Sequence, residues 1–136
     1  MLRKSWPPLL LAALVIGFVG AAIGTIGGPG QARIEKNDAA RYKAMKSLEN
    51  LVHCIAKEDG ALPDAVAQDA RCKGRRYPEN PSPAILADLT YAKESTRRFR
   101  ICSQFEDAAS FYERRSQPQR FDPDSGCIDG QIKSAP

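Results

Sequence analysis

The sequence has few of the residues from which enzyme active sites are usually built. Its 136 residues include a single histidine, His53, and a single tryptophan. It contains no G-x-S-x-G, no H-E-x-x-H and no glycine-rich phosphate loop, which excludes the common hydrolase, zinc-protease and nucleotide-binding patterns. Without a motif around it, His53 is typical of an exposed helix residue, with a general base as the alternative. We therefore expect no catalytic residue and no cofactor.

Patterns for metal ions and nucleic acids are equally scarce. No two cysteines form C-x-x-C, and their spacings are too wide for standard zinc fingers. Residues 122–129, DPDSGCID, offer part of a calcium loop but lack the late glutamate of an EF-hand. Residues 33–136 carry 18 basic side chains (the 20 of the chain less Arg3 and Lys4) against 16 acidic ones. Because this balance is too even for nucleic-acid binding, we expect neither a metal ion nor a nucleic-acid partner.

Charge is absent from Ser5 to Ala32, and this uncharged run is the most informative feature of the chain. A helix from Pro8 to Gly28 would be about 31 Å long, which matches the hydrocarbon core of a bilayer. Such a helix would satisfy its own backbone hydrogen bonds in lipid. We predict an N-terminal segment at 1–6, a transmembrane helix (signal anchor) at 7–28 and a hinge at 29–33.

The charges that flank this run predict its orientation. Arg3 and Lys4 precede it, so the positive-inside rule keeps the N-terminus cytoplasmic and places the rest of the chain across the membrane. A bacterial inner membrane with a periplasmic C-terminal domain is the predicted location. The alternative is a signal peptide cleaved after Ala32, because Gly30-Gln31-Ala32 has small residues where a signal peptidase requires them.

Glycines repeat every fourth residue within the apolar run, at Gly20, Gly24 and Gly28. A doubled G-x-x-x-G face lets two membrane helices approach closely. It predicts a homodimer or packing on a partner membrane helix. The alternative is that these residues only reflect the general abundance of glycine in membrane helices.

All the cysteines lie beyond the apolar run, and their number is even, which predicts disulfides in an oxidising compartment. The four are Cys54, Cys72, Cys102 and Cys127. Three pairings are open. We favour Cys54–Cys72 and Cys102–Cys127, since each would join neighbouring elements.

Residues 34–136 are predicted to form an α+β domain in which a helix at 34–58 packs on a small antiparallel sheet. Asn37 and Asp38 would cap a turn if this helix restarts there. Glu49 and His53 are among the polar residues predicted to lie off its apolar stripe. The stripe consists of Ala44, Met45, Leu48, Leu51, Val52 and Ile55.

A β-hairpin is predicted at 89–105, with Phe99, Ile101, Ser103 and Phe105 on the face toward the helix, because apolar and polar residues alternate there. Asp64–Cys72 would be a short helix, and residues 84–88 a further helical turn. Residues 108–119 are polar and poorly periodic, so no element is predicted for them. Two basic clusters, at 71–76 and 97–100, indicate a solvated face or, alternatively, a site for an acidic partner or an anionic lipid headgroup.

Short motifs in this order resemble small bacterial single-pass membrane proteins with a pilin- or pseudopilin-like layout. The motifs are Asp38-x-x-Arg41, Leu48-x-x-Leu51, Gly60-x-Leu62-Pro63, Arg100-Ile101-Cys102-x-x-Phe105 and Gly126-Cys127. The resemblance implies an envelope protein of structural or assembly type. The chain departs from true prepilins, since Ala22 stands where they carry glutamate after Gly17-Phe18.

These observations predict a single-pass envelope protein that acts through protein–protein contacts, as an accessory, scaffold or pseudopilin-like subunit. Its partners would be the lipid bilayer and an envelope protein. The alternative is a secreted, disulfide-stabilised binding or inhibitor module released by cleavage after Ala32.

Overall fold

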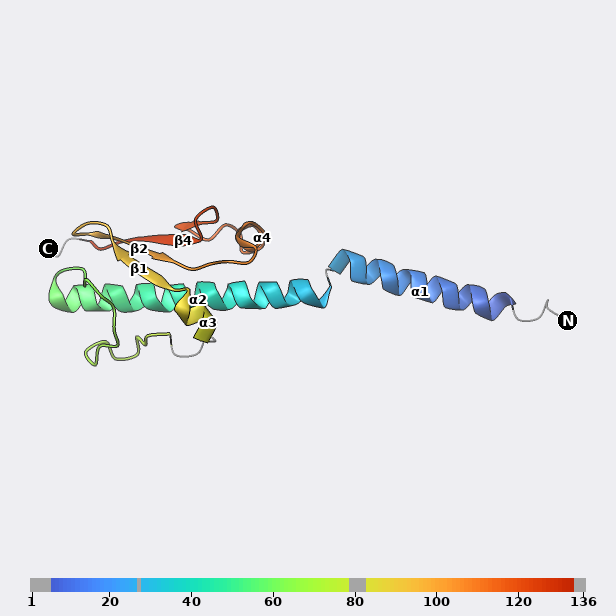
Figure 1. Cartoon of the computed structure of the whole chain (residues 1–136), viewed down its shortest axis with the longest axis horizontal. Coiled ribbons are helices and arrows are strands. Elements are labelled where there is room, and N and C mark those ends of the chain that lie inside the picture. The colour runs from blue at the N-terminus through green and yellow to red at the C-terminus, as the bar shows by residue number, and fades with distance from the viewer. Residues whose placement is uncertain (1–5, 27, 79–82, 134–136) are drawn as a thin grey trace. The chain divides into compact units, whose positions relative to one another are not determined.

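A computed structural model describes residues 6–26, 28–78 and 83–133. The chain divides into two compact units, Met1–Ile34 and Glu35–Pro136. Figure 1 traces the elements in chain order. We describe each unit by itself.

Helix α1, Trp6–Ile26, forms most of the first unit. Pro7 and Pro8 lie in its first turn, where a missing N–H group costs little. The helix ends at Ile26, short of the predicted end at residue 28. Gly28 is not helical, because it precedes Pro29 and the proline ring disfavours helical backbone at the residue before it.

Helix α2, Pro29–Asp59, begins earlier than the predicted helix at 34–58. Residues 29–33, predicted to be a hinge, are therefore helical. Proline suits the first position of a helix because its φ angle is already helical and its missing N–H needs no partner there. At the other end, Gly60 has a φ of +72°, the left-handed conformation that terminates helices.

The second unit contains a four-stranded antiparallel sheet with strand order β1-β2-β4-β3. Its strands are β1 Thr90–Lys93, β2 Arg98–Cys102, β3 Phe121–Asp122 and β4 Cys127–Gln131. The predicted α+β class is confirmed, and so is a hairpin within 89–105, although its second strand ends at Cys102 and not at Phe105. The two C-terminal strands were not predicted, because β3 has only two residues and β4 includes a glycine.

Two short helices complete the second unit: α3, Pro83–Ala87, and α4, Ala108–Arg114. The first matches the predicted turn at 84–88, whereas the second lies where no element was expected. The helix predicted at Asp64–Cys72 is wrong, since this segment consists of bends and turns. Apart from Val66 and Cys72 its apolar residues are alanines, which offer little surface for a helix to bury, and a disulfide holds the segment instead.

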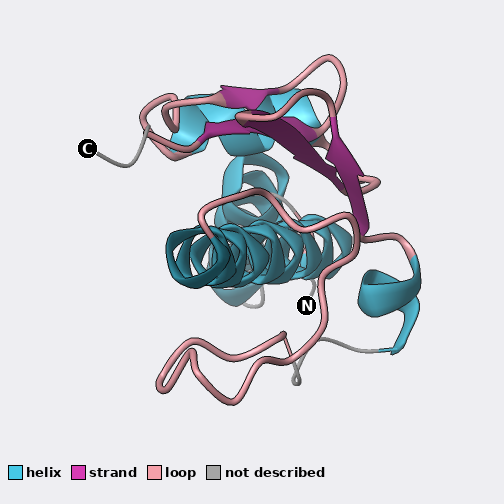
Figure 2. Cartoon of the chain, turned by 90° about the vertical axis from the view of Figure 1, so that its left-hand side faces the viewer, coloured by secondary structure: helices cyan, strands magenta, loops and turns pink. Residues whose placement is uncertain are grey.

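The sheet and the 60–78 segment cover opposite sides of α2 (Figures 1 and 2). On the sheet side, Phe99, Ile101 and Ile128 pack with α2 residues such as Met45. On the other side, Leu51 and Ile55 pack with Cys72. The predicted apolar stripe of α2 is therefore buried on two sides, which explains its width.

Gly126 allows the turn before β4 to pass close to the end of β2. Its φ is +65°, and a Cβ added there would lie 2.6 Å from the carbonyl oxygen of Ser103. The amide of Ser103 in turn donates to the carbonyl of Gly126 at 3.1 Å. Only glycine satisfies both the backbone angle and this approach.

Two disulfides brace the second unit, and they are the pairs that we favoured. Cys54–Cys72 ties the 60–78 segment to α2, and Cys102–Cys127 links directly opposite residues of β2 and β4. Closing loops of this length stabilises a folded chain by about 3 kcal/mol each in the chain-entropy treatment. The two bonds indicate an oxidising compartment.

Candidate functional site

Helix α1 is the most unusual surface of the molecule. Its described side chains are exposed and almost all apolar. Among the described residues, the structure has one helix long and apolar enough to cross a membrane, and it lies near the N-terminus, where a signal sequence would also lie. A soluble protein rarely leaves so large an apolar surface uncovered.

The three glycines predicted to pack against another helix do not all lie on α1. Gly20 and Gly24 are on the helix, whereas Gly28 follows its end. A Cβ added at any of the three would meet nothing within 4 Å. The G-x-x-x-G face is thus shorter than predicted, and its role in packing stays a prediction.

In the second unit, Asp38 is a buried carboxylate that connects distant parts of the chain. It is 1% exposed. Its oxygens accept hydrogen bonds from the amides of Glu106 and Asp107, both at 2.9 Å, and from Nη1 of Arg41 at 3.0 Å. The predicted role of Asp38 as a cap within its own helix is wrong. It lies inside α2 and instead holds the start of α4 against α2.

Glu49 is a second buried carboxylate, although its position predicted an exposed residue. It is 3% exposed. Lys46 forms an ion pair with it, and Arg120 Nη1 and His53 Nε2 lie 3.7 and 3.8 Å from its Oε1. Burial raises the pKa of Glu49, but the interactions with His53 and Lys46 outweigh burial, so the net pKa lies below the ordinary value of 4.5.

The lowered pKa of Glu49 predicts a specific response to acid. A carboxylate with a depressed folded-state pKa contributes stability above its unfolded pKa, and this contribution is lost as the pH falls below 4.5 through the folded pKa. Glu49→Gln should therefore destabilise the protein at pH 7, and its difference from the wild type should shrink on acidification. Urea unfolding at steps from pH 7 to 3 measures this. Glu113→Gln, on the exposed side of α4, is the control. A Glu49→Gln difference independent of pH would contradict the assignment.

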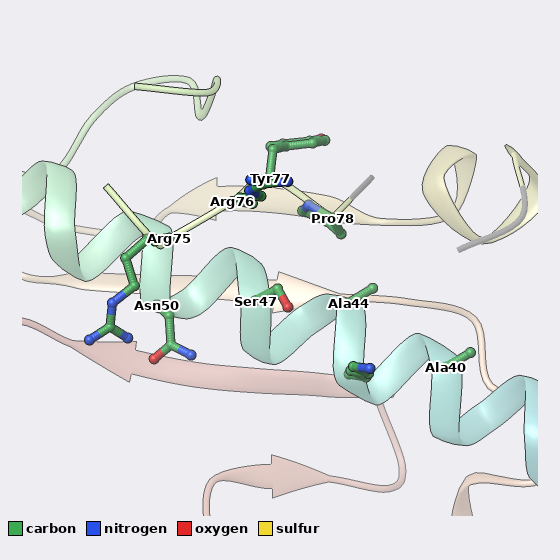
Figure 3. A pocket seen from close by; sticks show the side chains of 10 residues that line it. Ala40, Ala44, Ser47, Asn50, Arg75, Arg76, Tyr77 and Pro78 are labelled. Atoms are coloured by element: carbon green, nitrogen blue, oxygen red, sulfur yellow. The ribbon is translucent and has the colours of Figure 1, made fainter. Parts of the chain in front are cut away.

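A groove of about 620 Å³ lies between α2 and the 74–78 segment (Figure 3). Its α2 side presents small or polar side chains, and its other side presents two arginines, a tyrosine and a proline. The lining residues are Ala40, Lys43, Ala44, Ser47, Asn50, Gly74, Arg75, Arg76, Tyr77 and Pro78. Among the described residues that line it, none is acidic. Of the basic cluster predicted at 71–76, Arg75 and Arg76 line one wall of this hollow while remaining exposed, whereas Arg71 is paired with Asp59 and Asp69.

Two hydrogen bonds of Gln68 and one disulfide constrain the outer wall of this groove, residues 74–78. The side chain of Gln68 donates to the carbonyl of Arg75 at 3.2 Å and accepts from the amide of Tyr77 at 2.7 Å. Immediately before the wall, Cys72 is bonded to Cys54 of α2. The disulfide thus fastens the segment to α2 next to the wall, and the two bonds of Gln68 fix the conformation of the segment itself.

A second hollow of about 420 Å³ adjoins the first along α2. The two share Ala40 and Lys43, and the second adds Tyr42, Lys46 and Arg115. The Arg115 guanidinium lies 5.5 Å from the centre of the Phe111 ring. Both hollows are therefore lined by cations, and Lys43 stands between them.

The remaining candidates take structural positions. His53 is half-buried, with its ring edge-on to Phe99 at 5.4 Å between centres. In the turn at 122–129, Asp122 accepts from the Ser125 hydroxyl and the Asp124 amide, and these bonds lower its pKa. Within the described ranges no three His, Cys, Asp or Glu residues gather as a metal site would require.

Comparison of the chain with protein-family profiles, curated proteins and solved structures gives no match. The resemblance to pilin-like membrane proteins therefore stays a prediction from short motifs.

Proposed function

We propose that this protein is a single-pass membrane protein of a bacterial envelope whose Glu35–Pro136 unit works outside the cytosol through contacts with other proteins. The observation that carries the proposal is α1. Its exposed apolar surface is long enough to cross a bilayer, and lipid would cover it. Arg3 and Lys4, placed before the helix, orient the N-terminus toward the cytoplasm.

The second unit supports the same proposal. Its two disulfides suit the oxidising periplasm, where the predicted orientation would place it. Its core is filled by side chains from α2, α4 and the sheet, and its hollows lie open on the surface beside α2. Preformed surface grooves of this kind suit recognition of a partner.

Photo-crosslinking in intact membranes tests this function. A crosslinking amino acid placed at Ser47, in the groove, should yield a discrete adduct of higher mass, whereas the same group at Glu113, on α4, should yield less. A homodimer or a defined envelope partner would support the proposal. A protein that stays monomeric from both positions would contradict it.

The secreted module remains the second candidate, because a signal sequence also lies near the N-terminus and can be as apolar as α1. It requires cleavage after Ala32. In the structure, residues 30–32 lie inside α2, so cleavage would remove its first turn. Soluble periplasmic protein that begins at Arg33 would favour this candidate over the anchored one.

A further inference from the structure

We propose that the two adjoining hollows beside α2 bind an extended acidic segment of the partner protein. This inference rests on the proposed function, since it assigns the chemistry of the partner through which the protein would act. The basic cluster at 71–76 was compatible with an acidic partner or an anionic lipid headgroup, and this inference selects the acidic partner.

The first argument is the distribution of charge. The second unit has nearly equal numbers of basic and acidic residues, but most of the described acidic side chains form ion pairs within the unit. They are Glu35, Asp38, Glu49, Asp59, Asp64, Asp69, Glu94, Glu106 and Asp129. Lys43, Arg75 and Arg115, which line the hollows, are among the described cations that form no ion pair within the unit. A balanced total therefore conceals a positive surface that attracts anions.

The second argument is the shape of this surface. Ala40 and Ala44 keep the α2 side low, and Pro78 adds an apolar contact on the other side. In Figure 3 the side chains of Ser47 and Asn50 stand along the same stretch of helix, where they could bond a peptide backbone. Such a mixture of small, apolar and polar groups suits a chain lying along the helix.

The third argument is length, and it favours a peptide over a lipid headgroup. Ten residues of α2 separate Ala40 from Asn50, which is about 15 Å along the axis. An extended chain rises about 3.3 Å per residue, so four to five peptide residues match this stretch. A lipid phosphate would engage one point, whereas Lys43, Arg75 and Arg76 line the first hollow and Lys43 and Arg115 the second, which also includes Lys46, the partner of Glu49.

Fluorescence anisotropy of a labelled peptide tests the inference on the full-length protein in detergent micelles. The probe is an alternating Glu-Ala decapeptide, with a Lys-Ala decapeptide as its opposite. We expect the acidic probe to bind and the basic one not to bind. Reversing the groove charge with Lys43→Glu and Arg75→Glu together should weaken binding by at least about tenfold, because each reversal replaces attraction of the acidic peptide by repulsion.

Two further variants show whether peptide binding depends on the groove itself or only on the net charge of the protein. Arg97→Glu with Arg98→Glu makes the same change in net charge at exposed positions of the β1–β2 hairpin, and it should alter binding by less than about twofold. Ala40→Trp keeps the charge but fills the space that both hollows share, and it should weaken binding. Circular dichroism of each variant confirms that the fold is retained.

The outcomes are distinct. No binding of the acidic probe at low salt, equal loss in both charge-reversal pairs, or no effect of Ala40→Trp would overturn the inference. So would binding of the protein to phosphatidylglycerol vesicles that depends on Lys43 and Arg75 while the peptide fails to bind. Membrane association of α1 is measured in the same material. If association is intact and the peptide does not bind, the inference fails while the proposed anchoring stands.

Discussion

Asp38→Ala is expected to lower the free energy of unfolding by about 3–5 kcal/mol, the usual cost of removing one partner of a buried ion pair. The carboxylate is 1% exposed and accepts three hydrogen bonds. Without it, the amides of Glu106 and Asp107 lose their acceptor where water does not reach easily. Arg41, whose side chain is 11% exposed, keeps only its contact with Glu106. Urea unfolding followed by circular dichroism measures the loss.

Two variants show whether the cost arises from this network. Asn37→Ala removes a neighbouring bond to Glu106 that lies at the surface, and it should cost less than about 1 kcal/mol. Asp38→Ala combined with Arg41→Ala should cost less than the sum of the two single changes, because the lone buried charge is gone. An Asp38→Ala variant as stable as Asn37→Ala would show that Asp38 does not hold α4 in place.

Phe99→Ala is expected to have an effect of similar size, about 3–5 kcal/mol. Phe99 is fully buried in the main core and is paired in register with Gly130 of β4. Its ring occupies the space above that glycine: a Cβ at Gly130 would lie 2.1 Å from Cζ of Phe99. Truncation therefore empties the centre of the interface between α2 and the sheet.

The contact between Phe99 and Gly130 can also be tested by adding a methyl group at the glycine. Gly130→Ala should be destabilising by about 1–3 kcal/mol, because an added methyl group has no space beside the ring. In a Phe99→Leu background, where the ring is absent, the cost of Gly130→Ala should fall by at least about half. Equal costs of Gly130→Ala in both backgrounds would mean that the ring does not lie on the glycine.

The features that the sequence predicts well are those set by local pattern. The hairpin at 89–105 follows from strict alternation, and α1 from an uncharged run. The long helix also follows from its stripe, although its start at Pro29 was missed because the Gly-Gly-Pro-Gly stretch was interpreted as a hinge. Proline after glycine begins a helix as readily as it interrupts one.

The features that were missed depend on contacts between residues far apart in the chain. Asp38 appeared to be a local cap, but it bonds amides 68 and 69 residues away. Glu49 was placed on the polar side of α2, yet its carboxylate is buried and is approached by the exposed side chains of Lys46 and Arg120. Short strands such as β3 form only because β4 is already paired with β2.

The groove was also only partly predictable. The basic cluster at 71–76 is visible in the sequence, but its position opposite Lys43 is not. The Cys54–Cys72 bond fastens the segment to α2, and the two bonds of Gln68 set the conformation in which the segment presents the cluster. A loop without periodicity gives no local indication of where it will dock, although the favoured cysteine pairing already predicted that the loop returns to α2.

Membrane fractionation combined with intact-mass analysis tests the account most directly. The account predicts that the protein stays in the membrane pellet after alkaline extraction. It also predicts that the mass includes α1, and that no cysteine reacts with an alkylating reagent until the disulfides are reduced. Uncleaved protein in the soluble fraction, with Cys54, Cys72, Cys102 and Cys127 all alkylated, would contradict it.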